Sequence, residues 1–178
     1  MALGDHLAAP LTALKTLLGE SINFRTLMGV ALVSEEWTLV QAKAAAEAKV
    51  SMGYGLDKNE FVKDSVSDTA DQFPRTIIAI EDVSSDRQTV SSWTTELSIS
   101  LRIDALAPST TMTLPERYFN FLERVEGTVD DIRDASADMT RINLQSVETA
   151  VAPQRLETRD QGNMPELWYV VLMLGVQT

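Results

Sequence analysis

The stretch PELWYVVLMLGV, residues 165–176, is uncharged from Leu167 to Leu174. Successive side chains of a β-strand point to opposite faces, so a strand with one face in water alternates apolar and polar residues. This stretch is apolar on both faces, which indicates a strand that is buried on both sides. The fold must therefore supply a cover for each face.

We expect one face of this strand to pack under a long helix at residues 116–134. Two covers remain open for the other face: the leucine stripe at residues 7–18 of the same chain, or a neighbouring subunit. Without a cover, about four large side chains would each forfeit roughly 1.5–3 kcal/mol. They would also leave an adhesive apolar patch.

Three further strands are indicated upstream. Residues 93–104, WTTELSISLRID, alternate with the period of a strand. Leu97, Ile99, Leu101 and Ile103 share one face, and Ser98, Ser100 and Arg102 share the other. Residues 74–83 are rich in β-branched side chains, and 84–89 have the composition of a turn, so the two strands form a hairpin. Residues 141–149 predict another strand, followed by a polar connection at 150–165.

The helix between these strands has a clear beginning. Thr113 and Glu116 have the spacing of a capping box, and Pro115 suits a first helical turn. The apolar residues then recur with helical spacing, which predicts an amphipathic helix that ends near residues 135–138. This stripe comprises Tyr118, Phe121, Leu122, Val125, Val129 and Ile132.

The amino-terminal part is predicted to be helical. Leucines at residues 3–18 follow each other at spacings of four and three, with a firm start expected at Pro10 and a stop at Gly19. Residues 22–33 are compatible with a strand or a helix. Ser34 is a candidate N-cap for an alanine-rich helix that the GYG at 53–55 ends.

The element order is therefore two helices, two strands, one helix and two strands. It predicts an α+β fold in which a four-stranded, mainly antiparallel sheet carries a long helix on one face. We divide the chain into an amino-terminal helical segment at 1–55, a linker or loop at 56–72, and an α+β core at 73–178.

Composition narrows the function. The 178 residues include 26 acidic and 15 basic residues, a net charge of −11, and the arginines are spread out, so sequence-specific nucleic-acid binding is disfavoured. Cysteine is absent, which excludes disulfides and thiolate metal sites. No apolar run reaches the ~20 residues that span a bilayer, and Asp5 and His6 stand where a signal peptide is basic. We expect an intracellular protein.

Residues with catalytic or ligand-binding potential are few. His6 is the single histidine and lies near a terminus, where rigid partners are scarce. Asp130, Asp131 and Asp134 occupy one helical turn, yet Arg133 interrupts them, and they are interpreted as a solvated helix face. No phosphate-binding glycine motif and no nucleophile elbow occurs. We expect no enzyme activity, no catalytic residue, no cofactor and no metal site.

Large apolar residues are instead the candidate functional residues. Trp93 and Trp168 both begin strands and are expected to line one end of the sheet. Ten side chains are candidates for sheet packing or subunit contact: Trp93, Leu97, Ile99, Leu101, Tyr118, Leu122, Val125, Trp168, Val170 and Leu172.

The order of segments from residue 73 to 178 resembles the tail terminator proteins of long-tailed bacteriophages, also described as minor tail or tail completion proteins. The segments are FPRTIIAIEDV, WTTELSISLRID, LPERYFNFLERVEGTVDDI, RINLQSVET and ELWYVVLMLGV. The resemblance lies in order and periodicity and transfers no individual residue.

The resemblance implies a homo-oligomeric ring, usually a hexamer, that caps the tail tube and stops its growth. Its partners would be the tail tube protein, a head-completion or neck connector protein and, in some tails, a sheath-related protein. Its location would be the virion, and the host cytoplasm during assembly. An acidic lumen would avoid holding DNA.

Alternative functions remain open because one fold hosts many functions. The chain could be another neck or head-completion connector, a host adaptor module, or a small α+β enzyme that uses carboxylates. An enzyme would present a concave pocket with convergent polar groups, whereas a ring subunit would present extensive contact surfaces.

Overall fold

A computed structural model describes residues 3–30, 38–54, 73–87, 93–106, 111–137, 142–156 and 166–177. The helices within these ranges are α1 (Leu3–Glu20), α2 (Ile22–Leu27), α3 (Leu39–Glu47) and α5 (Leu114–Ala137). The strands are β1 (Val50–Tyr54), β2 (Arg75–Arg87), β3 (Trp93–Leu106), β4 (Asn143–Leu156) and β5 (Leu167–Gln177).

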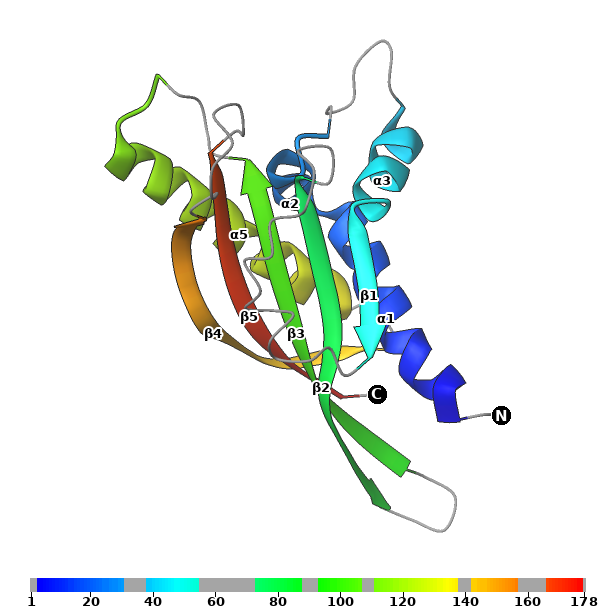
Figure 1. Cartoon of the computed structure of the whole chain (residues 1–178). Helices are drawn as coiled ribbons and strands as arrows, with labels where there is room; N and C mark the ends of the chain where they lie inside the picture. Colours follow the sequence, from blue (N-terminus) through cyan, green and yellow to red (C-terminus); the bar gives the residue numbers. More distant parts are fainter. Residues whose placement is uncertain are drawn as a thin grey trace.

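All five described strands belong to one sheet, in the order β1-β2-β3-β5-β4 (Figure 1). The first pair, β1 and β2, is parallel, and the other three pairs are antiparallel. The expected α+β fold with a long helix is confirmed. The expected four-stranded sheet is wrong, because Val50–Tyr54 adds a fifth, parallel strand beside Thr76–Ile80.

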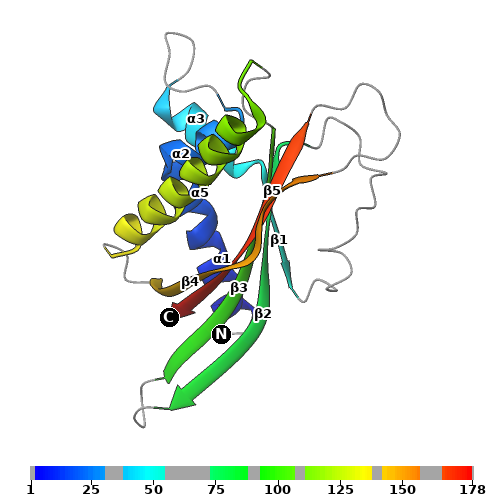
Figure 2. The same ribbon diagram turned by 90° about the vertical axis from the view of Figure 1, so that its left-hand side faces the viewer.

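The described helices cover one face of the sheet, as the side view shows (Figure 2). A single apolar cluster joins the layers: Leu14 and Leu18 of α1 and Phe121 of α5 are buried with Ile99 of β3 and Leu172 of β5. The face of β3 that alternation predicted to be buried therefore lies against the helices. The amino-terminal helices share this core with residues from 73 onward, and the expected linker at 56–72 lies outside the described residues.

The amino-terminal leucine stripe does not cover the second face of β5. Leu11, Leu14, Leu17 and Leu18 pack in the same cluster as α5, on the helical side of the sheet. The periodicity correctly indicated that these leucines are buried, but it contains no information on which surface receives them. Of the two covers left open for the second face, the leucine stripe is therefore excluded.

Helix boundaries also differ from the expected ones. Helix α1 continues to both sides of Pro10, so the expected start at Pro10 is wrong. An interior proline costs a helix one backbone hydrogen bond, and the packing of the leucines on α1 offsets this loss. Ser21 caps α2 by accepting a hydrogen bond from the backbone of Phe24 at 3.0 Å. Thr38 caps α3 in a capping box with Gln41, whereas the expected cap Ser34 lies outside the described residues. Helix α3 ends at Glu47, before β1 begins, and not at the GYG.

Strands β2 and β4 are longer than predicted. Ser84 to Arg87 were expected in a turn but continue β2 opposite Trp93–Glu96. The connection expected at 150–165 begins with strand, because β4 runs to Leu156; residues 157–165 lie outside the described part. Strand β4 is an edge strand with three register shifts. A proline such as Pro153 is tolerated at an edge or a bulge.

Candidate interaction surfaces

The predicted core candidates converge on one side of the sheet. Leu97, Ile99, Leu101, Val125, Trp168, Val170 and Leu172 are buried in one cluster, and the half-buried Tyr118 packs against them. Leu122 is half-buried and lines a groove described below. These nine residues therefore pack the sheet against α5. The side chain of Trp93 lies outside the described residues, and its backbone pairs with Arg87.

The two strand-opening tryptophans do not share one end of the sheet. Strands β3 and β5 are antiparallel, and Trp168 pairs with Ala105, near the opposite end of β3 from Trp93. This expectation is wrong because both strands were assumed to start at the same edge. The Trp168 ring lies 5.8 Å from the ring of Tyr118, and its Nε1 donates to Glu166 Oε1 at 2.9 Å.

The acidic turn of α5 is tied into structural contacts. Asp131 Oδ2 accepts hydrogen bonds from Ser21 Oγ at 2.6 Å and from Asn23 Nδ2 at 3.2 Å. Asp130 instead pairs with Arg133 at 2.9 Å on the exposed surface. Across the described residues, no group of three or more His, Cys, Asp or Glu side chains is placed to hold a metal ion. His6 lies in α1, and its side chain is outside the description.

The start of α5 contains a carboxyl group with a displaced pKa. The backbone nitrogen and the hydroxyl of Thr113 each donate to Glu116 Oε2 at 2.8 Å. These hydrogen bonds lower the pKa of the exposed Glu116 carboxyl below its usual value. The expected pairing of Thr113 with Glu116 is therefore present, and its role is to fix the first turn of the helix.

The second face of β5 has a small apolar cluster of its own. Leu167 is fully buried and packs with Phe73 and the half-buried Tyr169, apart from the main core. The guanidinium of Arg102 lies 5.0 Å from the Tyr169 ring centre, and that of Arg75 lies 4.7 Å from the Phe73 ring centre. Aromatic faces attract cations of this kind.

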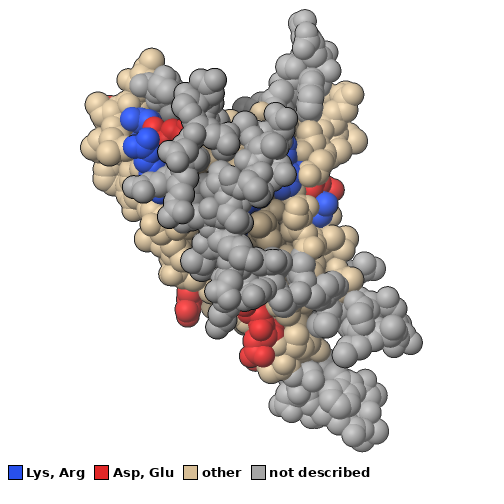
Figure 3. All heavy atoms as spheres, viewed as in Figure 1, with Lys and Arg blue, Asp and Glu red and all other residues tan. Residues whose placement is uncertain are grey.

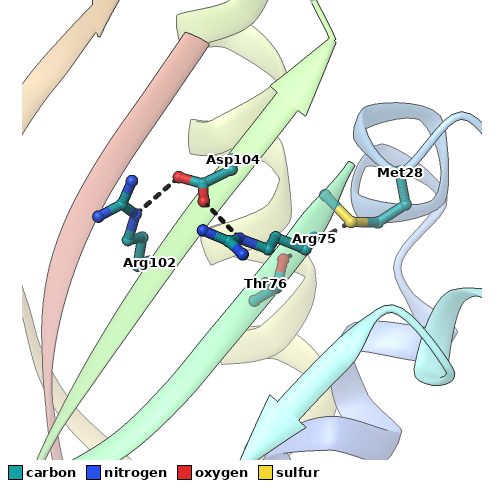
Figure 4. Close-up of polar contacts among 5 residues, drawn as sticks. All are labelled: Met28, Arg75, Thr76, Arg102 and Asp104. Carbon is teal, nitrogen blue, oxygen red and sulfur yellow. Dashed lines mark hydrogen bonds and ion pairs between the residues drawn. The ribbon is translucent and has the colours of Figure 1, made fainter. Parts of the chain in front are cut away.

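A buried ionic triad lies beside that cluster (Figure 4). Asp104 is fully buried and accepts from Arg102 Nε at 2.7 Å and from Arg75 Nε at 3.1 Å. Residues 102 and 104 share one face of β3, and Arg75 is the direct cross-strand partner of Asp104. Removing the Asp104 carboxylate would leave two adjacent guanidinium groups, of which Arg102 is buried, without the charge that they share. The triad therefore helps to cover the second face of the sheet. Sequence alternation had indicated only that this face of β3 is polar.

The β2–β3 hairpin extends beyond the other strands as an arm (residues 81–87 and 93–95; Figures 1 and 2). The pairing of β1 with β2 ends at Ile80, and the pairing of β5 with β3 ends at Glu96. No described strand flanks the arm. At ~3.3 Å per residue it is about 20 Å long, and Val83 on it is 42% exposed.

Charge is unevenly distributed over the face of the sheet that lies opposite the helices. In the described part of this face, Figure 3 shows acidic side chains toward the arm end, and basic side chains together with further acidic ones toward the other end. Glu81 and Asp82 at the base of the arm and Glu96 on the facing strand are all exposed. The arm therefore combines an acidic base with edges that no described strand flanks.

A groove of about 330 Å³ separates α5 from β4 and β5. Its apolar wall consists of Leu122, Val125 and Val129 from α5, Val147 and Pro153 from β4, and Val170 and Leu172 from β5. Glu126, Asp130 and Arg133 of α5 and Thr149 of β4 form its polar rim. The register shifts of β4 bend this edge strand, so α5 does not fill the space.

Several large apolar side chains remain exposed outside the groove. They are Ile22, Leu39, Val40, Met52, Val83, Leu106, Met112, Leu114 and Phe119. Val40 and Phe119 are the most exposed, at 75% and 65%. Our sequence reasoning missed them, although Phe119 falls off the apolar stripe of its helix, which is a signal of an exposed contact. Val40 was expected on a thin apolar face that packs against another element, and within this chain it is exposed instead.

Two comparisons with known proteins found no match, so the functional proposal depends on the sequence and on the surfaces described above. No protein-family model matches the sequence, and no curated protein matches it. Among the described helices, none is long and apolar enough to cross a membrane.

Proposed function

We propose that this chain is a structural virion protein that caps the tail tube of a bacteriophage as an oligomeric ring. In this role it ends tube growth and forms the tail-side surface of the head–tail joint. The proposal rests on the sequence resemblance and on one structural observation, the β2–β3 arm. Its neighbours would be other copies of the chain, the tail tube protein, and a neck or head-completion connector.

The arm supports an assembly role because of its energetics. A two-stranded hairpin alone is marginally stable in water, since it buries little apolar surface. No described strand pairs with its outer edges beyond Ile80 and Glu96, and the edge of a strand readily accepts a strand or a loop from another chain. An arm of this kind gains most of its stabilisation when a neighbouring protein covers it.

The remaining surfaces are consistent with this role. Among the described residues, Asp131 and Glu116 of α5 are held by hydrogen bonds to Ser21, Asn23 and Thr113. Glu126 and Asp130 meet at the groove rim, where Asp130 is paired with Arg133. The net charge of −11 suits a conduit whose wall must not bind the phosphates of passing DNA. We therefore favour binding to other proteins through complementary surfaces over binding of a small substrate by reactive groups.

The experiment is negative-stain imaging of the purified protein alone and mixed with tail tubes. We expect rings, or tubes with capped ends, for the unchanged chain. Val83→Asp places a charge on the arm and should abolish capping. Ile22→Asp is the matched control, because Ile22 is 51% exposed on α2 and should leave capping intact.

Single particles that ignore tube ends would contradict the proposal. So would equal capping by the Val83 and Ile22 variants, because the arm would then have no part in it. Binding to the head connector instead of the tube would indicate that the chain is a neck protein.

A further inference from the structure

A rigid apolar knob projects from one flank of the subunit. Leu39 and Val40, here called the α3 knob, are 43% and 75% exposed in the first turn of α3. The capping box of Thr38 and Gln41 fixes this turn. The buried side chains of Ala42 and Ala46 hold the helix against the rest of the protein. The knob is therefore displayed on a fixed element and would lose little conformational entropy on docking.

An apolar socket lies on the other flank. The α5–β4 groove has an apolar wall and a charged rim, the composition of a site that accepts apolar side chains. The exposed Phe119 lies on the same helical face as Leu122 and Glu126, at spacings of three and seven residues. Phe119 itself does not line the groove.

The knob and the socket belong to opposite edges of the sheet. Helix α3 leads into β1, the first strand in the sheet order, whereas the groove borders β4, the last one. Figure 1 shows α3 and β4 on opposite sides of the molecule. A contact that joins two different patches of identical chains is heterologous and generates a closed ring or a filament.

We propose that the α3 knob of one copy inserts into the α5–β4 groove of the next copy. This inference rests on the proposed function, to which it adds the lateral contact of the ring. Burial of two aliphatic side chains in an apolar groove supplies the attraction. Charge agrees in sign for one pair, because Lys49 lies just after α3 and Glu126 stands on the groove rim. Lys43 and Asp130 are already paired within the subunit, with Glu20 and Arg133 respectively.

The arrangement also separates two kinds of contact. The knob and the groove lie on the flanks, so they link copies side by side. The arm projects past the end of the sheet (Figure 2), so it remains available for a neighbour above or below. One subunit can therefore engage lateral and axial partners at the same time.

Site-directed cross-linking tests this contact directly, since the natural chain has no cysteine to interfere. Val40→Cys and Thr149→Cys place thiols on the knob and on the groove rim, both at exposed positions. With a short bifunctional maleimide, the double variant should form a ladder of covalent oligomers. Each single variant should form no species larger than a covalent dimer.

The matched control is the Ile22→Cys, Thr149→Cys pair, in which an exposed apolar position on α2 replaces the knob. It should form no ladder. Absence of a ladder from the Val40, Thr149 pair at millimolar protein would overturn the proposal, and so would an equal ladder from the control pair.

A mixing experiment tests the direction of the contact. Val40→Glu inactivates the knob and Thr149→Arg obstructs the groove, and each change should weaken self-association by about tenfold or more. Mixed together, the two variants retain one intact knob and one intact groove. They should form a 1:1 complex by light scattering that grows no further. Complexes that grow beyond two chains, or no complex, would overturn the proposal.

These outcomes are distinguishable from failure of the proposed function. Tube capping that survives in the Val40→Glu variant would refute the lateral contact and leave the capping role intact. A cross-link ladder from a protein that ignores tail tubes would support the contact and refute the capping role.

Discussion

The β2–β3 pair is one ladder with two unlike halves. Between Arg75 and Ile80 it is flanked by β1 and β5 and packed under the helices, and Ile78 and Leu101 are fully buried there. In the arm no described strand flanks it, and Val83 is 42% exposed. The two halves share their backbone pairing and differ in burial. The comparison indicates that pairing gives the arm its shape, whereas burial gives the inner half its stability.

The largest expected effect contrasts one apolar side chain from each half. Leu101→Ala creates a cavity in the core and should lower the free energy of unfolding by about 2–5 kcal/mol. Val83→Ala removes an exposed side chain and should change it by less than about 0.5 kcal/mol. Urea unfolding followed by circular dichroism measures both. Similar losses would mean that the arm is buried in solution.

The second-largest expected effect concerns the ion pairs of Asp104, which lie in the inner half on the face of the sheet away from the helices. Asp104→Asn removes the carboxylate charge that Arg75 and Arg102 share, and it should lower the free energy of unfolding by about 3 kcal/mol. Glu81→Gln, an exposed carboxylate change on the neighbouring strand, serves as the control and should have little effect. The same urea titration decides the matter. Equal stability of both variants would show that the triad contributes nothing net.

The smallest effect is a difference in local opening. Backbone amides of the arm should exchange with solvent at least about a hundredfold faster than those of Ile78 and Leu101, because few buried contacts restrain them. Hydrogen exchange with mass spectrometry measures the difference. It should narrow when the protein is added to tube ends. A difference that persists in capped tubes would exclude the arm from the contact.

Much of the fold follows from local patterns. Strand β3 was predicted because one face is strictly apolar, and α5 was predicted because a capping pair precedes a helical stripe. Burial on both faces of β5 was predicted because it lacks charge. In each case a single segment contains the whole signal, since its own periodicity specifies its face.

Other parts depend on contacts that no segment specifies alone. Strand β1 is short, contains Gly53 and directly follows an alanine-rich helix, so its pairing with β2 decides its state. The polar residues of the arm resembled a turn because neither face is apolar. Pro153 made the second half of β4 resemble a loop, because proline is tolerated only in edge strands or bulges and the sequence does not reveal that β4 lies at an edge.

The candidate surfaces were harder to predict than the core. The expected residues were large and apolar, and the structure places the described ones against α5. The groove arises from the bend of β4, and the α3 knob arises from exposure of Val40. Both depend on the relative position of elements distant in sequence. Only the departure of Phe119 from amphipathic order was visible beforehand.

The arm is continuous with β3, and β3 is the middle strand of the sheet order. Antiparallel inter-strand hydrogen bonds lie perpendicular to the strands. A pull along the arm axis draws β2 and β3 together, and would therefore load the bonds of β3 to β5 and of β2 to β1 simultaneously, in shear. A peeling force would break such bonds one after another. A partner in the tail joint that holds the arm would thus apply tension in the direction in which this subunit resists force best.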